Sequence, residues 1–326
     1  MLGAGSWGTA LALLLADAGA TVRLWDRTPA LASALAADRE NKRYLPDFPL
    51  PVAIMPTSDL QAALHGVSCV VVAVPSGAVR GVLERAAPYL PPVCDIVLAA
   101  KGLEEATGLL PADVAAEVLG NARLPLVALS GPNLAGEIAR GIPTAAVAAC
   151  PDKAAAARVA AWFNRSAFRV YTSADRTGVE LGGAIKNVLA IAGGVSDGLG
   201  YGDNTKATLL TRGLAEMTRL GIACEAEART FSGLAGVGDL MATAASRLSR
   251  NWRVGEGLAK GEALPAILQR LGQVSEGVPT ARAVVQLARQ KNVEMPVCEA
   301  VHDLLFGGVT PQETVSRLLS RSRGNE

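Results

Sequence analysis

The sequence predicts an α/β domain with a doubly wound parallel sheet, followed by an all-α domain. Up to about residue 173, short apolar runs of strand length alternate with helical segments. This alternation is typical of βαβ units, in which helices cover both faces of a parallel sheet. Beyond that point the strand-like runs stop and only helical segments follow. We therefore expect two domains, over residues 1–174 and 175–326.

Each element is predicted from an apolar run and from the Gly, Pro, Asn or Asp residues that flank it. In the first domain the expected strands are Thr21–Trp25, Val67–Val74, Asp95–Ala99, Leu124–Leu129, Thr144–Ala149 and Phe168–Tyr171. The expected helices there are Thr9–Ala18, Pro29–Asp38, Ala78–Ala87, Pro111–Leu119 and Asp152–Asn164. In the second domain the expected helices cover residues 176–198, 204–220, 224–230, 237–247, 252–260, 263–270, 278–291, 296–305 and 311–320.

The composition excludes several classes of protein. The chain has 31 Lys and Arg against 30 Asp and Glu, and a net charge of +1 offers no basic surplus for a general nucleic-acid binder. Its two histidines are too few for a multi-histidine metal site, and its five cysteines form no CxxC motif. We therefore expect no metal site and reduced cysteines in the core.

Two apolar stretches resemble a signal peptide and a membrane span. Residues 9–16 are apolar, but no basic residue precedes them and Asp17 follows them. The longest uncharged stretch, Leu60–Val79, contains several polar residues and Pro75. We therefore expect a cytoplasmic protein without a membrane span.

A glycine-rich motif near the start of the chain predicts a dinucleotide site of the Rossmann type. Residues 3–8 read GAGSWG, a GxGxxG pattern that opens a helix, and the strand after this helix ends at Asp26. The glycines allow a tight turn and a close approach of the backbone to a pyrophosphate. The strand that should precede the motif is reduced to Met1 and Leu2, so the first strand is expected to be truncated. The expected cofactor-binding glycines are Gly3, Gly5 and Gly8.

The residues after the second strand leave the choice between NAD and NADP open. Asp26 can accept hydrogen bonds from a ribose 2′-hydroxyl, as in NAD-binding proteins. Arg27, directly beside it, can pair with the 2′-phosphate of NADP.

Polar residues follow two of the predicted buried strands, where ligands of open parallel sheets bind. Lys101 follows the strand that ends near Ala100, in the sequence AKG. The next strand ends in Ser130-Gly131-Pro132-Asn133, where a new helix begins. A lysine at a strand end, beside a cofactor rich in phosphate, indicates a second anionic ligand or a polarised oxygen.

Lys186 is the candidate for the proton transfer that accompanies hydride transfer to or from an alcohol carbon. It lies within an apolar helix, and burial lowers the pKa of a lysine towards neutrality. Asp239 is an isolated carboxylate in an apolar segment, and Lys186 is its natural partner. A structural ion pair between helices is an equally good interpretation of these two residues alone. The later run Ser249-Arg250-Asn251 suits recognition of a phosphate or carboxylate, although a solvated helix junction explains it as well.

Taken together, these segments resemble the bacterial NAD(P)-dependent sn-glycerol-3-phosphate dehydrogenases. The resemblance runs in order along nearly the whole chain, and its later motifs are more specific than the glycine motif. Asn133 departs from it, because the family often has Thr or Ser there. The matching motifs are GAGSWGTALA (3–12), AKGLE (100–104), SGPNLAGE (130–137), GVELGGAIKNVLAI (178–191), TRGLAEMTRLG (211–221), GLAGVGDL (233–240), SRN (249–251) and GQVSEG (272–277).

The resemblance implies a Rossmann domain followed by an all-helical domain like that of 6-phosphogluconate dehydrogenases. It implies reduction of dihydroxyacetone phosphate to sn-glycerol 3-phosphate for phospholipid synthesis, with NAD or NADP as cofactor, in a homodimer. Lys186 is the implied proton acceptor, assisted by Lys101 and Asp239. The implied substrate-binding residues are Lys101, Gly131, Asn133, Lys186, Asp239, Ser249, Arg250 and Asn251. The implied cofactor contacts, besides the glycines, are Ser6, Trp7, Arg27, Lys101, Ala135, Arg250, Val274 and Glu276.

Two other functions fit part of the pattern. A 3-hydroxyacid or 6-phosphogluconate dehydrogenase also places a lysine on the first long helix of its helical domain, but the SRN and GVGDL motifs oppose that assignment. A non-catalytic NAD(P)-binding sensor offers no reason for Lys101, Lys186, Asp239 and Arg250 to occur together.

Overall fold

The computed structural model describes residues 1–120 and 124–320, and the chain forms two compact units. Unit 1 consists of Met1–Ala100 and Leu110–Glu180, and unit 2 of Lys101–Leu109 and Leu181–Glu326. The division after residue 180 falls inside a helix rather than at residue 174. The segment Lys101–Leu109, expected in the first domain, groups with the helical unit.

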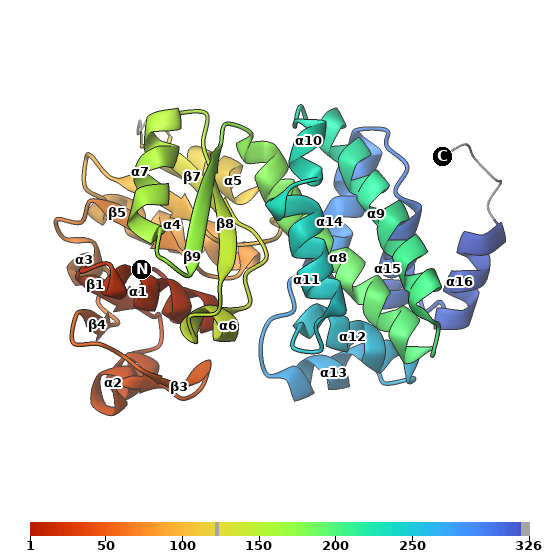
Figure 1. Cartoon of the computed structure of the whole chain (residues 1–326), viewed down its shortest axis with the longest axis horizontal. Helices are drawn as coiled ribbons and strands as arrows, with labels where there is room; N and C mark the ends of the chain where they lie inside the picture. Colours follow the sequence, from red (N-terminus) through yellow and green to blue (C-terminus); the bar gives the residue numbers. More distant parts are fainter. Residues whose placement is uncertain (121–123, 321–326) are drawn as a thin grey trace. The chain divides into compact units, whose positions relative to one another are not determined.

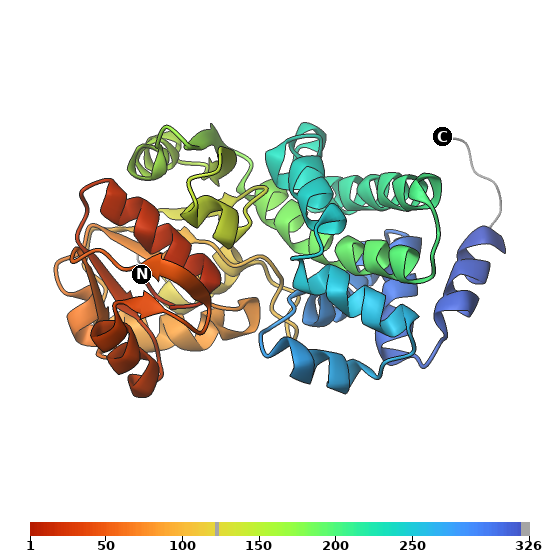
Figure 2. The same ribbon diagram turned by 60° about the horizontal axis from the view of Figure 1, so that its bottom comes forward.

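Unit 1 is built around a twisted sheet with helices on its two faces (Figures 1 and 2). Its strands are β1 (Val22–Trp25), β2 (Glu40–Asn41), β3 (Leu45–Pro49), β4 (Ile54–Thr57), β5 (Cys69–Val72), β6 (Asp95–Leu98), β7 (Leu126–Ser130), β8 (Thr144–Ala149) and β9 (Phe168–Ser173). Its helices are α1 (Ser6–Asp17), α2 (Pro29–Asp38), α3 (Leu60–Leu64), α4 (Val79–Ala86), α5 (Pro111–Leu119), α6 (Ala135–Ala139) and α7 (Lys153–Phe163). Short 3₁₀ turns cover Ser76–Ala78 and Ala87–Tyr89.

The first strand is as short as the sequence predicts, yet it joins the two halves of the sheet. Leu2 forms parallel bridges to Trp25 of β1 on one side and to Val72 of β5 on the other. Its amide donates to the carbonyl of Val71 at 2.8 Å, and its carbonyl accepts from the amide of Ala73 at 2.8 Å. The resulting strand order is β4-β1-Leu2-β5-β6-β7-β8-β9, with β2 and β3 forming a separate antiparallel pair.

The sheet is parallel except between β7 and β8, which pair antiparallel. The connection between them contains only α6, a helix of five residues. Such a helix is roughly 7.5 Å long, about half the length of β7, so it does not return the chain to the start of the sheet. The parallel sheet predicted from the sequence is therefore present except at this one pairing, where a crossover helix of full length is missing.

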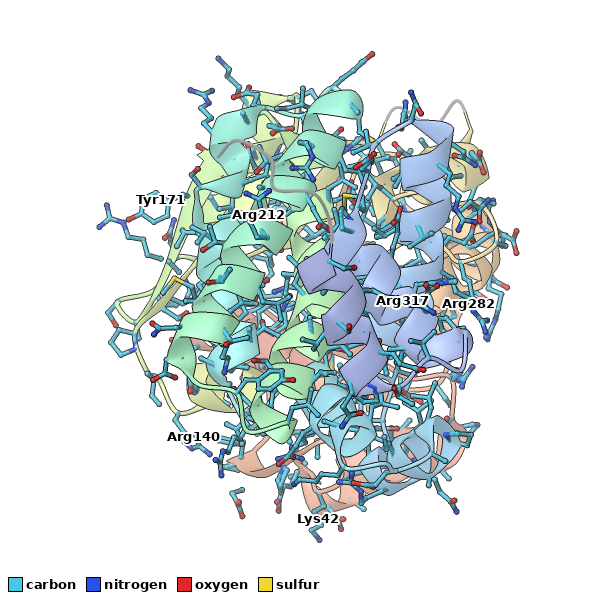
Figure 3. The ribbon with its side chains drawn as sticks, turned by 90° about the vertical axis from the view of Figure 1, so that its right-hand side faces the viewer. Lys42, Arg140, Tyr171, Arg212, Arg282 and Arg317 are labelled. Carbon is cyan, nitrogen blue, oxygen red and sulfur yellow. The ribbon has the colours of Figure 1, made fainter. Side chains whose placement is uncertain are left out.

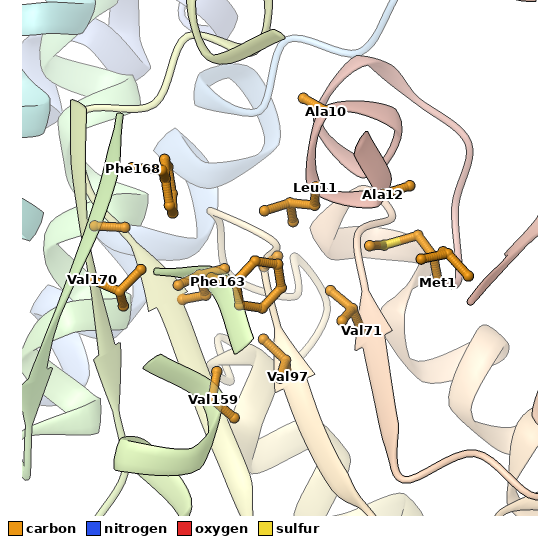
Figure 4. Close-up of a cluster of buried hydrophobic side chains, with 14 of the residues drawn as sticks. Met1, Ala10, Leu11, Ala12, Val71, Val97, Val159, Phe163, Phe168 and Val170 are labelled. Atoms are coloured by element: carbon orange, nitrogen blue, oxygen red, sulfur yellow. The ribbon is translucent and has the colours of Figure 1, made fainter. Parts of the chain in front are cut away.

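Apolar residues of α1 and α7 pack on one face of the sheet (Figure 4). Leu11 from α1 and Phe163 from α7 are fully buried there, beside Val97 of β6. Burial of side chains of this size contributes roughly 1.5–3 kcal/mol each, so this cluster holds the glycine-rich turn before α1 against the sheet.

The segment between residues 40 and 64 contains elements that the sequence analysis did not predict. It forms β2, β3, β4 and α3, although prolines interrupt the apolar pattern at 46, 49, 51 and 56. β4 pairs in parallel with β1 at the edge of the sheet, and an edge strand tolerates proline because one side needs no donor.

Unit 2 is helical apart from its connecting segments (Figure 1). Residues 224–227, expected in a helix, lie outside one, and Glu225 adopts a left-handed conformation with φ 64°. The helices are α8 (Arg176–Gly198, beginning in unit 1), α9 (Asp203–Ala223), α10 (Ala228–Phe231), a π-helical turn (Leu234–Gly238), α11 (Asp239–Ala245), α12 (Arg250–Ala259), α13 (Leu264–Leu271), α14 (Gly277–Gln290), α15 (Pro296–Phe306) and α16 (Pro311–Ser320).

Helix α8 is the buried core helix of unit 2. It is the one helix of the described residues that is long and apolar enough to cross a membrane, and its apolar window is 100% buried within the protein. None of the five cysteines, all of which lie among the described residues, forms a disulfide. Cys94, Cys150 and Cys298 are buried as the sequence predicts, whereas Cys69 and Cys224, also expected in the core, are only partly buried.

Candidate active site

The centre of the candidate site is Lys186, near the middle of α8. Its Nζ donates to Oδ1 of Asp239 at 2.8 Å and to Oγ1 of Thr243 at 2.7 Å. The residue is 6% exposed, and burial lowers the pKa of its ammonium to about 8, while the carboxylate of Asp239 opposes that shift and Lys101 adds to it. Lys186 is therefore a buried amine that loses its proton within about a unit of neutral pH.

Asp239, the first residue of α11, binds two lysines through its two oxygens. Its Oδ1 accepts from Lys186 and its Oδ2 accepts from Lys101 Nζ at 2.8 Å. Burial of this carboxyl opposes ionisation, but the two ammonium groups outweigh burial and hold its pKa below the usual value. Two cations and one anion leave this cluster with a net positive charge, which favours an anionic or developing-anionic ligand.

Lys101 lies at the start of the segment 101–109, which belongs to unit 2. Its carbonyl accepts a hydrogen bond at 2.8 Å from Nδ2 of Asn187, the neighbour of Lys186 on α8. Lys101 is thereby fixed at its backbone and at its ammonium group.

Thr243 is a residue of this cluster that the sequence analysis missed. It lies one helical turn after Asp239 on α11, is buried, and contacts the side chains of both Asp239 and Lys186. The signal was the spacing of four residues, which places two side chains on one face of a helix.

The run 249–251 forms the start of α12. The side chain of Ser249 caps this helix by accepting from the amide of Trp252 at 3.3 Å. The Arg250 guanidinium is exposed and donates to the carbonyl of Val274 at 2.6 Å, so two of the expected cofactor contacts lie together. Asn251 is buried and hydrogen-bonded to Asn187, and Glu276 directly precedes α14.

In unit 1 the glycine-rich motif forms the tight turn that its spacing predicts. Gly3 has φ 109°, and a Cβ on Gly8 would lie 2.0 Å from the carbonyl oxygen of Gly3. α1 begins at Ser6, whose hydroxyl donates to the carbonyl of Tyr44 at 2.6 Å. The Nε1 of Trp7 is buried without a partner among the described residues.

The other expected contacts of unit 1 lie at the ends of β1 and β7. Arg27 is exposed, whereas Asp26 accepts from the amide of Thr28 at 2.9 Å. Gly131 follows β7 with φ 145°, and the Nδ2 of Asn133 donates to the carbonyl of Ala145 at 3.2 Å. Ala135 is the first residue of α6.

The turn in unit 1 fits the diphosphate of a dinucleotide. It combines a backbone that no side chain covers at Gly5 with the N-terminus of α1, whose first amides precede the first helical hydrogen bond from Thr9 to Gly5. The unpartnered indole N–H of Trp7 adds a donor beside this turn. Among the described residues, no group of three or more His, Cys, Asp or Glu side chains is arranged to hold a metal ion.

The structure thus gathers the expected residues into two groups, one in each unit. Direct contacts join Lys101, Asp239 and Lys186, and separately Arg250 and Val274. In unit 1 the group is Gly3, Gly5, Ser6, Trp7, Gly8, Arg27, Gly131, Asn133 and Ala135. In unit 2 it is Lys101, Lys186, Asp239, Ser249, Arg250, Asn251, Val274 and Glu276.

Comparison with known proteins gives one consistent result. Residues 1–156 match the model of the N-terminus of NAD-dependent glycerol-3-phosphate dehydrogenase, and residues 175–316 match the model of its C-terminus. A glycerol-3-phosphate dehydrogenase (NAD(P)+) of Thioalkalivibrio sulfidiphilus is 49% identical over 326 residues, covering 100% of this chain and 98% of the relative. That of Geobacillus kaustophilus is 48% identical, covering 100% of this chain and 95% of the relative.

A solved structure agrees with the sequence relatives. The crystal structure of glycerol-3-phosphate dehydrogenase from Coxiella burnetii superimposes with a TM-score of 0.95 at 41% identity, covering 98% of each chain. The chain belongs to the NAD-dependent glycerol-3-phosphate dehydrogenase family.

Proposed function

We propose that this protein reduces dihydroxyacetone phosphate to sn-glycerol 3-phosphate, reversibly, with NADH or NADPH, and so supplies glycerophospholipid synthesis. Membership of the family supports this activity. The observation that carries the assignment of residues is the buried cluster in which Lys186 and Lys101 bind the two oxygens of Asp239. Such a cluster provides an acid and a positive field in one place, which reduction of a carbonyl requires.

In the proposed mechanism Lys186 donates the proton. With a pKa of about 8, the side chain of Lys186 is mostly protonated at neutral pH. Its ammonium group can therefore protonate the C2 oxygen as negative charge develops there. In the oxidative direction the neutral amine accepts the hydroxyl proton of sn-glycerol 3-phosphate. The reduced nicotinamide, when bound, supplies the hydride for C2.

Lys101 and Asp239 assist this step. Asp239 holds Nζ of Lys186 in one direction and favours its protonated form. Lys101 adds a second cation 2.8 Å from the same carboxylate, and we assign to it a contact with substrate and with cofactor. Thr243 accepts a hydrogen bond from Lys186 and so restricts the remaining freedom of the amine.

The remaining residues bind the two ligands in this proposal. The exposed Arg250, the first residue of α12, pairs with the substrate phosphate, because a guanidinium and a helix N-terminus both favour an anion. We assign further substrate contacts to Gly131, Asn133, Ser249 and Asn251. We assign cofactor contacts to Gly3, Gly5, Ser6, Trp7, Gly8, Arg27, Ala135, Val274 and Glu276.

We also propose a cytoplasmic homodimer, the state that the family resemblance implies. Analytical ultracentrifugation of the purified protein and fractionation of cells test these two points separately.

The test of function is oxidation of NADH and of NADPH, followed at 340 nm, with dihydroxyacetone phosphate. We expect turnover in the wild type, loss of it in Lys186→Ala, and unchanged turnover in Lys260→Ala. Lys260 is a matched control, since it also pairs with a carboxylate, Glu256 at 2.7 Å, but on the exposed side of α12. Turnover of a 3-hydroxyacid or of 6-phosphogluconate, without turnover of dihydroxyacetone phosphate, would overturn the proposal.

A further inference from the structure

A chain of hydrogen bonds runs from the first residue of α14 to the backbone of Lys101. The amide of Gly277 donates to Oδ1 of Asn251 at 2.9 Å. The Nδ2 of Asn251 donates to Oδ1 of Asn187 at 2.7 Å, and the Nδ2 of Asn187 donates to the carbonyl of Lys101 at 2.8 Å. Four segments that are distant in sequence are thereby linked through two amide side chains.

The direction of this chain is fixed by the backbone groups at its ends. The amide of Gly277 can only donate, so the group of Asn251 that faces it is the oxygen. The Nδ2 of Asn251 therefore faces Asn187, which must present its own oxygen there. The Nδ2 of Asn187 is then left for the carbonyl of Lys101, which can only accept. Neither asparagine can be turned over without breaking bonds at both of its ends.

Ser275 adds a further hydrogen bond to this chain. Its hydroxyl donates to Oδ1 of Asn251 at 2.6 Å, so this oxygen accepts two hydrogen bonds, one for each lone pair. Only one hydrogen of the Asn251 amide is then available for a hydrogen bond to a substrate.

The chain is buried and closely packed. Asn187, Asn251 and Ser275 are 4%, 7% and 3% exposed, and buried amides without partners are costly. A Cβ on Gly277 would lie 2.5 Å from the carbonyl oxygen of Asn187, so only glycine lets α14 begin this close to α8. The geometry of the chain is therefore determined by the packing of the helices.

We propose that Ser275 positions Lys101, acting through the two asparagine side chains. Removing its hydroxyl leaves Asn251 with one restraint fewer, and the amide of Asn187 then holds the carbonyl of Lys101 less firmly. In this assignment the main task of Asn251 is to orient Asn187. The catalytic consequence rests on the role proposed above for Lys101.

A further ion pair on the same segment is more exposed and weaker. Glu105 pairs with Arg282 of α14 at 2.8 Å, but both side chains are about half exposed, and Figure 3 shows Arg282 at the surface of the helical unit. An exposed pair of this kind contributes only ~0–1 kcal/mol. The buried chain through Asn187 thus restrains the segment 101–109 more strongly than this exposed pair does.

The experiment compares Ser275→Ala and Asn251→Asp with the wild type. The aspartate retains an acceptor for Ser275 and Gly277 but cannot donate to Asn187, because its second oxygen faces the oxygen of Asn187. Ser196→Ala is the matched control. Its hydroxyl is equally buried, at 3% exposure of the residue, and has no hydrogen-bond partner among the residues that the structure describes.

The first readout is hydrogen–deuterium exchange of the segment 101–109, which does not depend on activity. The amides of Glu104 and Gly108 are bonded within this segment, to Leu109 and Glu104 respectively. We expect both to exchange faster in the two test variants and at the wild-type rate in Ser196→Ala. The second readout is kcat for dihydroxyacetone phosphate, which we expect to fall by about 10- to 100-fold, the usual effect of slight misplacement of a catalytic group.

The third readout separates positioning from general loss of stability. Lys186 faces Asp239 and Thr243 of α11, Lys101, and the charge of Arg250, and Lys101 lowers its pKa. If Lys101 is displaced in Ser275→Ala, the pKa of Lys186 rises above about 8, and the pH profile of kcat shifts upward with it.

The outcomes are distinct. Three results would each overturn the positioning role. The first is exchange at the wild-type rate in Ser275→Ala, and the second is faster exchange with an unchanged kcat and pH profile. The third is an equal effect in the control variant Ser196→Ala. If the wild type fails to reduce dihydroxyacetone phosphate, the proposed function is wrong, and the exchange measurement still decides whether Ser275 restrains the segment.

Discussion

Lys186 and Lys101 bind opposite oxygens of one buried carboxylate, each with its Nζ 2.8 Å from Asp239. The two lysines come from segments 85 positions apart in the sequence, and the carboxylate between them offsets the repulsion of their charges. This arrangement ties the acid strength of Lys186 to the placement of Lys101.

Replacing Asp239 with Asn should disable catalysis while preserving shape. The carboxylate raises the pKa of Lys186, so its removal lowers that pKa further and leaves two lysines beside each other. We expect kcat at neutral pH to fall by about 100-fold or more, as for loss of a general acid. Steady-state kinetics check this, with Asp303→Asn on the exposed face of α15 as the control. Full activity in Asp239→Asn would show that the charge of this carboxylate is not needed.

Gly5→Ala should separate cofactor binding from folding. Gly5 has φ −73°, and nothing lies within 4 Å of an added Cβ, so the protein without cofactor tolerates alanine. The added methyl group occupies the space that a bound pyrophosphate needs. We expect Tm within about 2 °C of the wild type and NADH binding weakened about tenfold or more.

The control for Gly5→Ala is Gly81→Ala in α4, where an added Cβ also meets nothing within 4 Å. Calorimetric titration with NADH distinguishes the two variants. Equal affinity in Gly5→Ala and Gly81→Ala would place the cofactor elsewhere.

Arg27→Ala should change the preference between the two cofactors. The guanidinium is exposed beside Asp26, whose carboxylate already accepts from the amide of Thr28. Hydrogen bonds to charged groups contribute roughly 1.5–3 kcal/mol, so loss of a contact with the 2′-phosphate should raise KM for NADPH about 10- to 100-fold. KM for NADH should stay the same. A parallel rise for both cofactors would mean that Arg27 does not contact the 2′-phosphate.

Glu216→Ala should lower stability in a manner that depends on pH. The buried carboxyl of Glu216 accepts from the amides of Val297 and Cys298 at the start of α15, at 2.7 and 3.2 Å. Leaving these two donors unpaired should cost about 2 kcal/mol or more. Burial raises the pKa of Glu216 from 4.5 to about 7 in the folded protein.

The raised pKa fixes the sign of the pH dependence. Between about pH 4.5 and 7 the carboxyl of Glu216 keeps its proton in the folded state but has lost it in the unfolded state. The contribution of Glu216 to the free energy of unfolding is therefore full below pH 4.5 and declines as pH rises through 7. Urea unfolding should show that the difference in the free energy of unfolding between wild type and Glu216→Ala becomes smaller over this pH range. Glu299→Ala, in the first turn of α15, is the control, and a gap that widens with pH would contradict the assignment.

The sequence predicted most of unit 1 because its buried strands and helices carry strong apolar patterns. It missed β2, β3 and β4, where prolines break the pattern, and α3, which is only five residues long. The antiparallel pairing of β7 with β8 depends on the short length of α6 rather than on any local signal.

The site was predictable where its residues lie in distinctive motifs, and less so where the fold brings them together. Lys186 and Asp239 were expected to pair, and they do. The bond between Asn251 and Asn187 joins residues 64 positions apart, and the part of Ser275 depends on how α14 packs on α8. Such contacts depend on helix crossings, which the sequence of one chain does not specify.

The role of Lys186 as the acid is tested most directly by the pH dependence of kcat in both directions. With Lys186 as the acid and a pKa near 8, reduction of dihydroxyacetone phosphate should decline as pH rises through about 8, and oxidation of sn-glycerol 3-phosphate should increase over the same range. Lys186→Arg, which stays charged, should abolish both titrations together with most of the activity. Profiles that are flat around pH 8, or an active Lys186→Arg with the same titrations, would show that Lys186 is not the acid.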